Sequence, residues 1–177
     1  FWLSTAMTVV PVDSRGVRVR WGRYLTPPLE PGLHLTWPWP VESIVRVPAE
    51  RIQEVVIGFE RDLGRAVLWT VRHYEGEQNM LVGNGEDLLI VTMLFYYRIK
   101  DPIAWLQCTA DDRMALRNIA QRQLIRVLSA RETFRIMTFD REAIREAVWK
   151  GVQEETDRLG LGIKLVDVGL QDAHPPL

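Results

Sequence analysis

Side chains that could perform chemistry are few in this sequence and lie far apart. None of the three histidines has a second histidine four residues away, the spacing that places two imidazoles on one helix face for a metal: His34, His73 and His174. The only cysteine, Cys108, ends a short apolar segment, where we expect a packed thiol. One cysteine excludes an internal disulfide and is too few for a thiolate metal site. We therefore expect neither a metal nor a cofactor.

Other catalytic patterns are also missing. None of the four serines lies in a Gly-x-Ser-x-Gly sequence, which presents the nucleophile of many hydrolases. The glycines of Gly160–Gly162 follow a predicted helix, whereas a phosphate-binding loop precedes one. The acidic pairs are sequence neighbours, so their side chains point apart on a helix: Asp111 with Asp112, and Glu154 with Glu155. We expect no catalytic site and no enzymatic activity.

Arginine is the one conspicuous charged feature. Six arginines lie between positions 113 and 135 against a single acid, Glu132: Arg113, Arg117, Arg122, Arg126, Arg131 and Arg135. Such a segment could face nucleic acid or anionic lipid. However, the pair at 113 and 117 falls about 180° around a helix from the pair at 122 and 126. Because these arginines cannot form one stripe, we expect separate ion pairs, within the domain or between subunits, with the acidic helix that follows.

Composition supports a folded domain with balanced charge. The chain has 177 residues, 22 Lys and Arg against 23 Asp and Glu, and a net charge of −1. The hydrophobic fraction of 47% supports a packed core, and the charged fraction of 25% is ordinary for a globular surface. A dedicated nucleic-acid binder usually has a basic excess, so we expect no nucleic-acid partner.

The first hundred residues show the alternation of β-strands. The expected strands are residues 8–12, 16–21, 33–35, 43–47, 51–57, 66–71, 79–82 and 88–99. A Gly83-Asn84-Gly85 turn predicts that the last two form a hairpin. Two proline-rich segments, residues 26–32 and 37–40, predict rigid loops.

After residue 100 the period changes to that of helices. The expected helices are residues 103–108, 112–128, 134–137 and 140–160, followed by a strand at 163–170. The second begins after Thr109-Ala-Asp-Asp112, which has the form of a capping box, and Asp140 caps the fourth. Strands, then helices, then one strand predict an α+β fold with an antiparallel sheet.

Two of the predicted helices carry information about contacts. Apolar residues of the 112–128 helix spread over about 240°, whereas a helix on one core needs nearer ~100°. Either two sides of this helix are buried within its own domain, or one of them contacts another subunit. Trp149 lies off the apolar stripe of its helix, beside Glu146, Gln153 and Thr156, and tryptophan is enriched at interfaces. The residues predicted at a protomer interface are Arg113, Arg117, Arg122 and Trp149.

The first residues are apolar and uncharged. Residues 1–12 are too few to cross a bilayer, which needs ~20 apolar residues. Residues 1–6 are expected to be the exit end of a spanning helix that starts earlier, or else a frayed terminus before the first strand. Tryptophan prefers membrane interfaces, so two later tryptophans are expected beside this end unless they are core residues. The predicted membrane-proximal residues are Phe1, Trp2, Leu3, Trp37 and Trp39.

Four segments follow one another in the order of a known domain. They are Gly16-Val-Arg-Val-Arg-Trp-Gly-Arg23 with Leu29-Glu-Pro-Gly-Leu33, Tyr97-Arg-Ile-Lys-Asp-Pro102, Leu116-Arg-Asn-Ile-Ala-Gln-Arg-Gln-Leu-Ile-Arg-Val-Leu128, and Gly162-Ile-Lys-Leu-Val-Asp-Val-Gly-Leu-Gln-Asp-Ala-His-Pro-Pro176. Together they resemble the SPFH (stomatin, prohibitin, flotillin, HflK/C), or band-7, domain, most closely its HflK-like branch. The segment at residues 58–78 is longer than the corresponding segment of HflK-like proteins. The turn at residues 83–87 differs from the motif that is usual at this place in the family.

The resemblance implies an SPFH domain over residues 13–177, preceded by a membrane-exit stub and first strand at 1–12. Its β-rich part is expected at about 13–100, its helical part at about 101–160 and its last strand at about 161–172. It also implies a single-pass membrane anchor before residue 1 and a coiled coil after Leu177. The HflK branch favours the extracytoplasmic side in a bacterium, whereas stomatin favours the cytoplasm.

The same resemblance implies a function. Family members are non-catalytic scaffolds that contact membrane lipids and assemble with themselves or with a paralogous SPFH protein. In the HflK branch they modulate an FtsH-type AAA membrane protease, and elsewhere they organise membrane microdomains. The alternatives are a lipid- or protein-binding module of a stomatin-like membrane protein and, from the enzyme class, a hydrolase.

Overall fold

A computed structural model describes residues 6–58, 79–108 and 112–175. The chain divides into two compact units, which we describe separately. The first contains the residues up to Gln53 together with residues 97–112 and 156–164. The second contains residues 54–96, 113–155 and those from Leu165 onward. Several elements, including the longest strand, run from one unit into the other.

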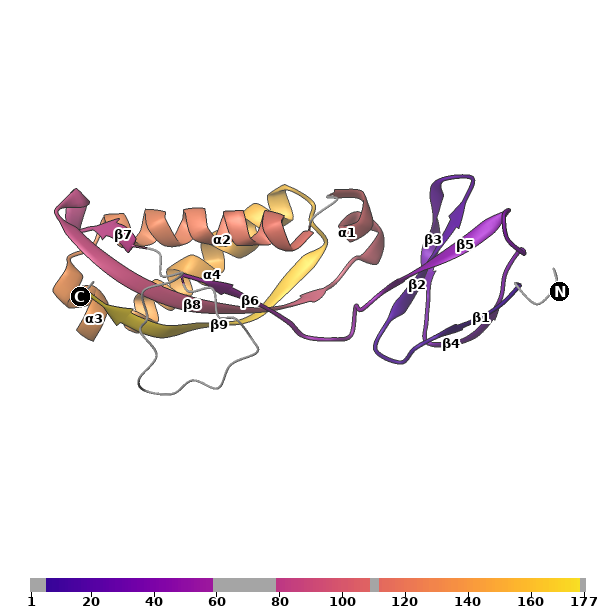
Figure 1. Ribbon diagram of the computed structural model, residues 1–177, viewed down its shortest axis with the longest axis horizontal. Coiled ribbons are helices and arrows are strands. Elements are labelled where there is room, and N and C mark those ends of the chain that lie inside the picture. The colour runs from indigo at the N-terminus through magenta and orange to yellow at the C-terminus, as the bar shows by residue number, and fades with distance from the viewer. Residues whose placement is uncertain (1–5, 59–78, 109–111, 176–177) are drawn as a thin grey trace. The chain divides into compact units, whose positions relative to one another are not determined.

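The first unit is built mainly of short antiparallel strands (Figure 1). Its strands are β1 (Met7–Val10), β2 (Arg15–Arg20), β3 (Arg23–Leu29), β4 (Gly32–Leu35) and β5 (Glu42–Val47). One sheet pairs β1 with β4, and a second has the order β3–β2–β5. Gly16 lies where the strands come together, because a Cβ there would be 2.9 Å from a methyl of Val10 and 3.2 Å from one of Ile44.

Strand β3 corrects one sequence prediction. Residues 26–32 were expected to be a loop, but β3 runs through Pro27 and Pro28 to Leu29. Among the described strands it pairs with β2 alone, at the edge of the β3–β2–β5 sheet. Proline has no N–H to donate, so a strand can contain it where one side needs no ladder bond.

Helix α1 (Pro102–Cys108) belongs to the first unit. Asp101 caps it, since its carboxylate accepts hydrogen bonds from the backbone N–H groups of Ile103 and Ala104 at 2.9 and 3.1 Å. Trp105 is buried, and its ring lies 6.1 Å from that of Tyr97. The Tyr97 hydroxyl donates to the Gln53 side chain at 3.3 Å, which satisfies its polar end.

The second unit is a sheet covered by helices. Strand β8 (Asp87–Ile99) hydrogen-bonds β6 (Gln53–Ile57), β7 (Asn79–Val82) and β9 (Ile163–His174). The β7–β8 hairpin pairs Asn79 with Ile90 and Val82 with Asp87, as the turn at residues 83–85 predicted. Gly58 follows β6 with φ of +98°, and a Cβ there would be 1.8 Å from the Val91 carbonyl oxygen, so no other residue fits without a shift.

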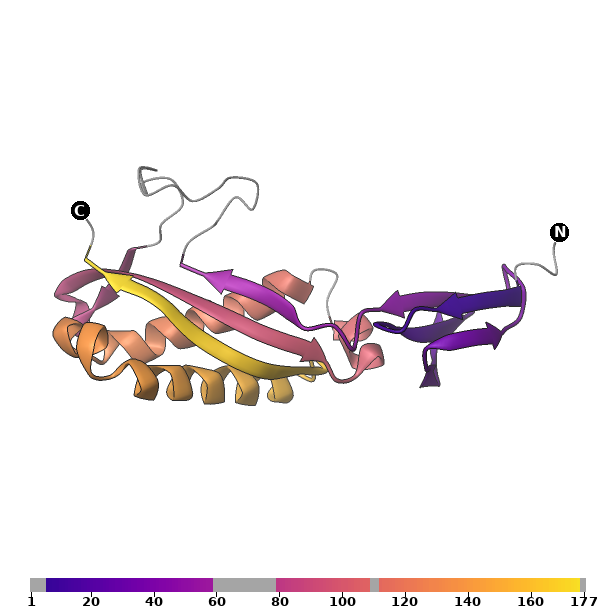
Figure 2. The same cartoon turned by 90° about the horizontal axis from the view of Figure 1, so that it is seen from below.

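Three helices belong mainly to this unit: α2 (Asp112–Ser129), α3 (Thr133–Thr138) and α4 (Arg141–Arg158). Figure 2 shows α2 and α4 along the same side of β8 and β9. The core between these layers contains Leu89, Val91, Met93, Phe95, Leu116, Leu124, Leu128, Ile144, Val148, Val152 and Val168.

The observed order of antiparallel strands, helices and a final strand confirms the predicted α+β class. Strand β9 is longer than expected, reaching His174 rather than Leu170. The strand expected at 66–71 lies outside the described residues, as do most of the capping-box residues before α2.

Candidate membrane-contact and assembly surfaces

The two described histidines and the cysteine lie on separate elements of the structure. The ring of His34 contacts the Glu30 carbonyl oxygen at 2.7 Å, and that of His174 lies 3.7 Å from the Asp172 carboxylate. His73 falls outside the described residues. In the part of the chain that is described, no three histidine, cysteine or acidic side chains come close enough to hold a metal ion.

Cys108 corrects another expectation. It is exposed rather than packed in the core, and the buried residues of its helix are Pro102 and Trp105. Its thiol lies 3.1 Å from the Gly160 carbonyl oxygen and 3.7 Å from that of Leu159.

An apolar face covers one side of the β1–β4 sheet. The register pairs Met7 with Leu35 and Val9 with Leu33. Each of the four side chains is exposed, by 60% for Met7, 82% for Leu35, 59% for Val9 and 62% for Leu33. Residues two apart on a strand share a face, so these four form one contiguous group. We call them the apolar strand face.

Trp37 and Trp39 follow β4 directly and extend this apolar character. They are 61% and 67% exposed, so they are not core residues of the part of the chain that the structure describes. Phe1, Trp2 and Leu3, the other predicted membrane-proximal residues, lie outside the described residues.

A buried carboxylate holds the start of the tryptophan segment. Glu42 is 4% exposed, and its Oε2 accepts from the Trp37 backbone N–H at 3.3 Å. The same carboxylate lies 3.2 Å from the Arg20 guanidinium and 3.8 Å from that of Arg18, both on the neighbouring strand β2. Two cations offset the cost of burying one charge, so Glu42 ties the loop to the three-stranded sheet.

Sequence reasoning identified the two tryptophans but missed the apolar strand face. The alternation in residues 7–10 and 33–35 was visible, yet alternation normally indicates a strand with its apolar side buried. Only the pairing of β1 with β4, and the absence of any described element over their apolar side, reveals four exposed side chains.

Helix α2 is apolar on more than its core side. Met114 is 51% exposed and Ile125 is 43% exposed, whereas Leu116, Ile119 and Leu124 are buried. Within the described residues, therefore, part of the wide apolar arc of α2 faces solvent instead of packing against the rest of the domain.

Three of the six arginines have ion pairs with acidic residues on or just before α4. Arg122 on α2 contacts Glu155 on α4 at 2.5 Å. Arg131 and Arg135 both face Asp140, at 3.6 and 3.1 Å. Arg117 is half-buried, and the side chain of Arg113 lies outside the described part. The pairing of Arg122 within its own domain leaves its predicted protomer contact untested.

Trp149 on α4 is 38% exposed, so more than half of its surface is covered within the chain. Gln153 and Thr156 were expected beside it on an open side. Instead, Thr156 is 1% exposed, and the Gln153 side chain accepts a hydrogen bond from the Leu165 backbone N–H at 2.8 Å. Strand β9 therefore reaches this side of α4, and the protomer contact of Trp149 stays a prediction.

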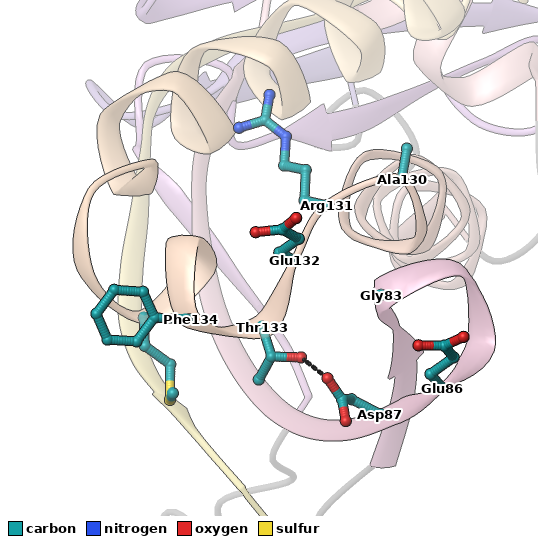
Figure 3. A pocket seen from close by; sticks show the side chains of 9 residues that line it. Gly83, Glu86, Asp87, Ala130, Arg131, Glu132, Thr133 and Phe134 are labelled. Atoms are coloured by element: carbon teal, nitrogen blue, oxygen red, sulfur yellow. Dashed lines mark hydrogen bonds between the residues drawn. The ribbon is translucent and has the colours of Figure 1, made fainter.

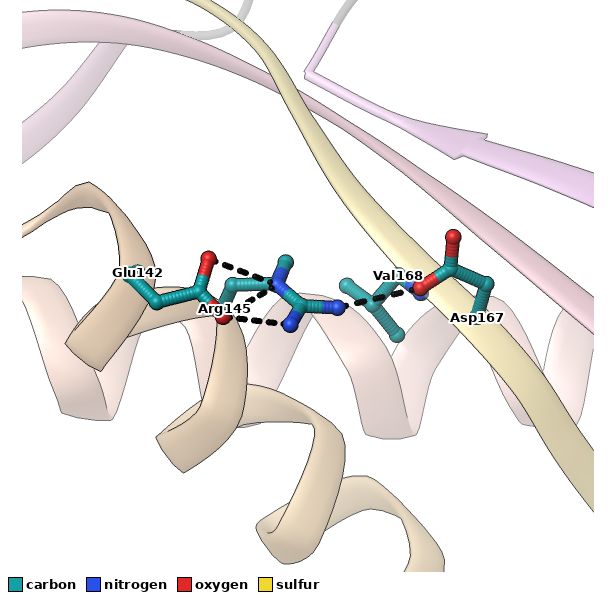
Figure 4. Close-up of polar contacts among 4 residues, drawn as sticks. All are labelled: Glu142, Arg145, Asp167 and Val168. Atoms are coloured by element: carbon teal, nitrogen blue, oxygen red, sulfur yellow. Dashed lines mark hydrogen bonds and ion pairs between the residues drawn. The ribbon is translucent and has the colours of Figure 1, made fainter.

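An exposed ionic network lies on the same helix (Figure 4). Arg145 donates to Glu142 and, at 3.1 Å, to Asp167 on β9. The hydrogen bonds and charge of Arg145 lower the pKa of the Glu142 carboxyl, and Glu142 in turn raises the pKa of Arg145. The network stabilises the charged forms of these side chains and offers no uncommitted acid or base.

An open pocket of about 610 Å³ lies beside the β7–β8 turn (Figure 3). Thr133 donates to Asp87 across it at 2.5 Å, while Glu86 and Glu132 add negative charge. The Arg131 guanidinium pairs with Asp140. The described lining contains no histidine or cysteine, and its one hydroxyl–carboxylate contact is that of Thr133 with Asp87.

Comparisons with known proteins show which family this chain resembles. Residues 8–177 match the model of the SPFH domain / Band 7 family. Protein HflK of Treponema pallidum is 28% identical over 98% of this chain and 53% of its own length. Protein HflK of Borreliella burgdorferi is 25% identical over 95% of this chain and 52% of its own length. The Modulator of FtsH protease HflK of Escherichia coli K12 is 24% identical over 99% of this chain and 36% of its own length.

The chain thus spans between about a third and about half of these curated relatives. Among the described helices, none is both long and apolar enough to cross a bilayer. The family match covers nearly every residue, and the strands and helices follow the order that the sequence motifs predicted. This chain belongs to the SPFH domain / Band 7 family.

Proposed function

We propose that this chain is the non-catalytic scaffold domain of a membrane-anchored, HflK-type protein that modulates an FtsH-type AAA membrane protease. The observation that carries the proposal is similarity to HflK proteins over nearly the whole chain, one of which is named as a modulator of FtsH protease. The family and these names point to a non-catalytic role.

Within this proposal, the apolar strand face with Trp37 and Trp39 lies against membrane lipid, next to Phe1, Trp2 and Leu3. Two properties support the assignment. Four apolar side chains are exposed on the paired strands β1 and β4, and two tryptophans are exposed in the segment that follows β4. Tryptophan also favours the boundary between headgroups and acyl chains. A single-pass anchor before residue 1 would hold the domain there, on the extracytoplasmic side in a bacterium.

Copies of the domain, or a copy and a paralogous SPFH protein, then assemble side by side. The exposed Met114 and Ile125 of α2 and the half-exposed Trp149 of α4 support a contact made by these helices. The predicted interface residues Arg113, Arg117 and Arg122 lie on the same helix as Met114.

Reconstitution tests the proposal. The full-length protein and the FtsH-type protease of the same organism are placed together in proteoliposomes, and degradation of a membrane-inserted substrate is followed. A soluble unfolded substrate serves as the control. We expect the membrane substrate to be degraded at a changed rate and the soluble one at an unchanged rate. Equal rates for both substrates with and without the SPFH protein would overturn the proposal.

The apolar strand face also favours a second candidate, a lipid-binding module of a stomatin-like protein. That candidate predicts vesicle binding without any effect on the protease. A hydrolase predicts labelling of the pure chain by a serine- or cysteine-directed activity probe, and we expect none.

A further inference from the structure

Strand β9 presents a long edge in the second unit. The strand has 12 residues, and within the described residues it pairs only with β8. An unpaired strand edge carries N–H and C=O groups that can pair with another chain, so proteins usually protect such edges.

Side chains of α4 reach the backbone of this edge. Arg141 donates to the Leu170 carbonyl oxygen at 3.1 Å, and Gln153 accepts from the Leu165 N–H at 2.8 Å. Arg145 lies between them, four residues after Arg141 and eight before Gln153, on a row of residues spaced by four that winds about 40° around the helix at each step. One row of α4 therefore follows β9.

Arg145, in the middle of the row, contacts the backbone of β9 indirectly, through the side chain of Asp167. Arg145 donates to Asp167 Oδ1 at 3.1 Å, and the same oxygen accepts the Val168 N–H at 2.8 Å (Figure 4). Arg145 also pairs with Glu142, which leaves its guanidinium held between two carboxylates.

Three backbone groups of β9 have side-chain partners. The Leu165 N–H donates to Gln153, the Val168 N–H donates to Asp167, and the Leu170 carbonyl accepts from Arg141. Within the described residues β9 has β8 as its one strand neighbour, so these side chains compete for backbone groups with any strand that is added to β9.

We propose that Arg141, Arg145, Gln153 and Asp167 form an edge guard, which keeps β9 from pairing with β9 of a second copy. A second copy is the relevant partner because identical edges are self-complementary about a two-fold axis when they pair antiparallel. Confinement of copies to one membrane, which rests on the proposed function, would raise their effective concentration. The guard then leaves the helix surfaces free to determine how copies associate.

The test compares two triple variants of the 177-residue chain. The first removes the guard from α4 by Arg141→Ala, Arg145→Ala and Gln153→Ala. The control, Glu146→Ala, Lys150→Ala and Glu154→Ala, changes an adjacent row of exposed side chains on the same helix.

Sedimentation velocity over a concentration series measures self-association. We expect the guard variant to associate at least tenfold more tightly than the wild type, and the control to match the wild type. Amide hydrogen exchange locates the contact. In the guard variant, the Leu165 and Val168 amides should be less protected when the chain is dilute and regain protection as it associates.

Equal association of both triple variants and the wild type would overturn the proposal, as would association that leaves the β9 amides unchanged. If the guard variant loses its helical circular dichroism, the comparison moves to Gln153→Ala against Gln153→Glu. The alanine removes the acceptor of the Leu165 N–H, whereas the glutamate keeps an oxygen there. Tighter association of the alanine variant alone supports the guard, and identical behaviour refutes it.

Discussion

Replacing Trp37 and Trp39 by serine tests the lipid-facing surface directly. The two side chains are 61% and 67% exposed. The surface area of a tryptophan side chain is roughly 200 Å². Each of the two therefore exposes on the order of 120 Å² that membrane binding could remove from water. At about 25 cal/mol per Å², complete removal would be worth about 3 kcal/mol for each.

A side chain at the membrane interface remains partly hydrated, so we take half of this value. The pair then contributes about 3 kcal/mol to membrane partitioning, which corresponds to roughly a hundredfold change in the partition coefficient. Because both side chains are exposed, the free energy of unfolding should change by less than ~1 kcal/mol. The contribution comes from apolar area, so it should differ little between vesicles of phosphatidylcholine and vesicles with added phosphatidylglycerol.

Vesicle co-sedimentation of the 177-residue chain, together with thermal unfolding, measures both quantities. Trp21→Ser is the matched control, because Trp21 is 76% exposed but lies between β2 and β3, outside the apolar strand face. An equal loss of binding in this control would mean that any exposed tryptophan contributes and would refute the positional argument. A large fall in the unfolding midpoint with unchanged lipid binding would show that Trp37 and Trp39 serve the fold.

Three further substitutions test the second unit. Trp149→Ala should lower the free energy of unfolding by about 1–3 kcal/mol, since the side chain is partly covered, and weaken assembly of the full-length protein on cross-linking. Gly58→Ala should destabilise the chain by more than ~1 kcal/mol in urea unfolding, because its Cβ would collide with Val91. In Arg145→Ala, the pKa of Glu142 should rise towards its ordinary value in an NMR titration. The stability that this pair gives is present above the ordinary glutamate pKa and is lost as pH falls through the lowered one.

Much of this fold could be predicted because local signals and tertiary structure agree. The Gly83–Gly85 turn between two apolar runs predicted the β7–β8 hairpin, and the change of period after residue 100 predicted the α-helices that the structure describes there, α1 to α4. The exception was β3, where Pro27 and Pro28 indicated a loop. Proline is not tolerated in a central strand but is tolerated in an edge strand. Whether a strand lies at the edge depends on which strands pair, and the local sequence does not show this.

Candidate surfaces were harder to predict than elements. The exposure of Trp37 and Trp39 depends on what covers them, and their types alone fit a core or an interface equally well. The apolar strand face could not be separated from an ordinary half-buried strand, because alternation identifies a face without showing whether anything packs on it.

Trp149 shows how a helix-face argument reaches its limit. Angles around α4 put this residue off the apolar stripe, on an open side, but it is only 38% exposed and Thr156 on that side is buried. They could not show that β9 reaches the same side of α4, because the path of β9 depends on its pairing with β8 rather than on angles around a helix. Part of the predicted open side is thus occupied by the strand, and the exposed remainder is what a second protomer could contact. The loss of stability in Trp149→Ala and its loss of assembly therefore measure two separate portions of one side chain.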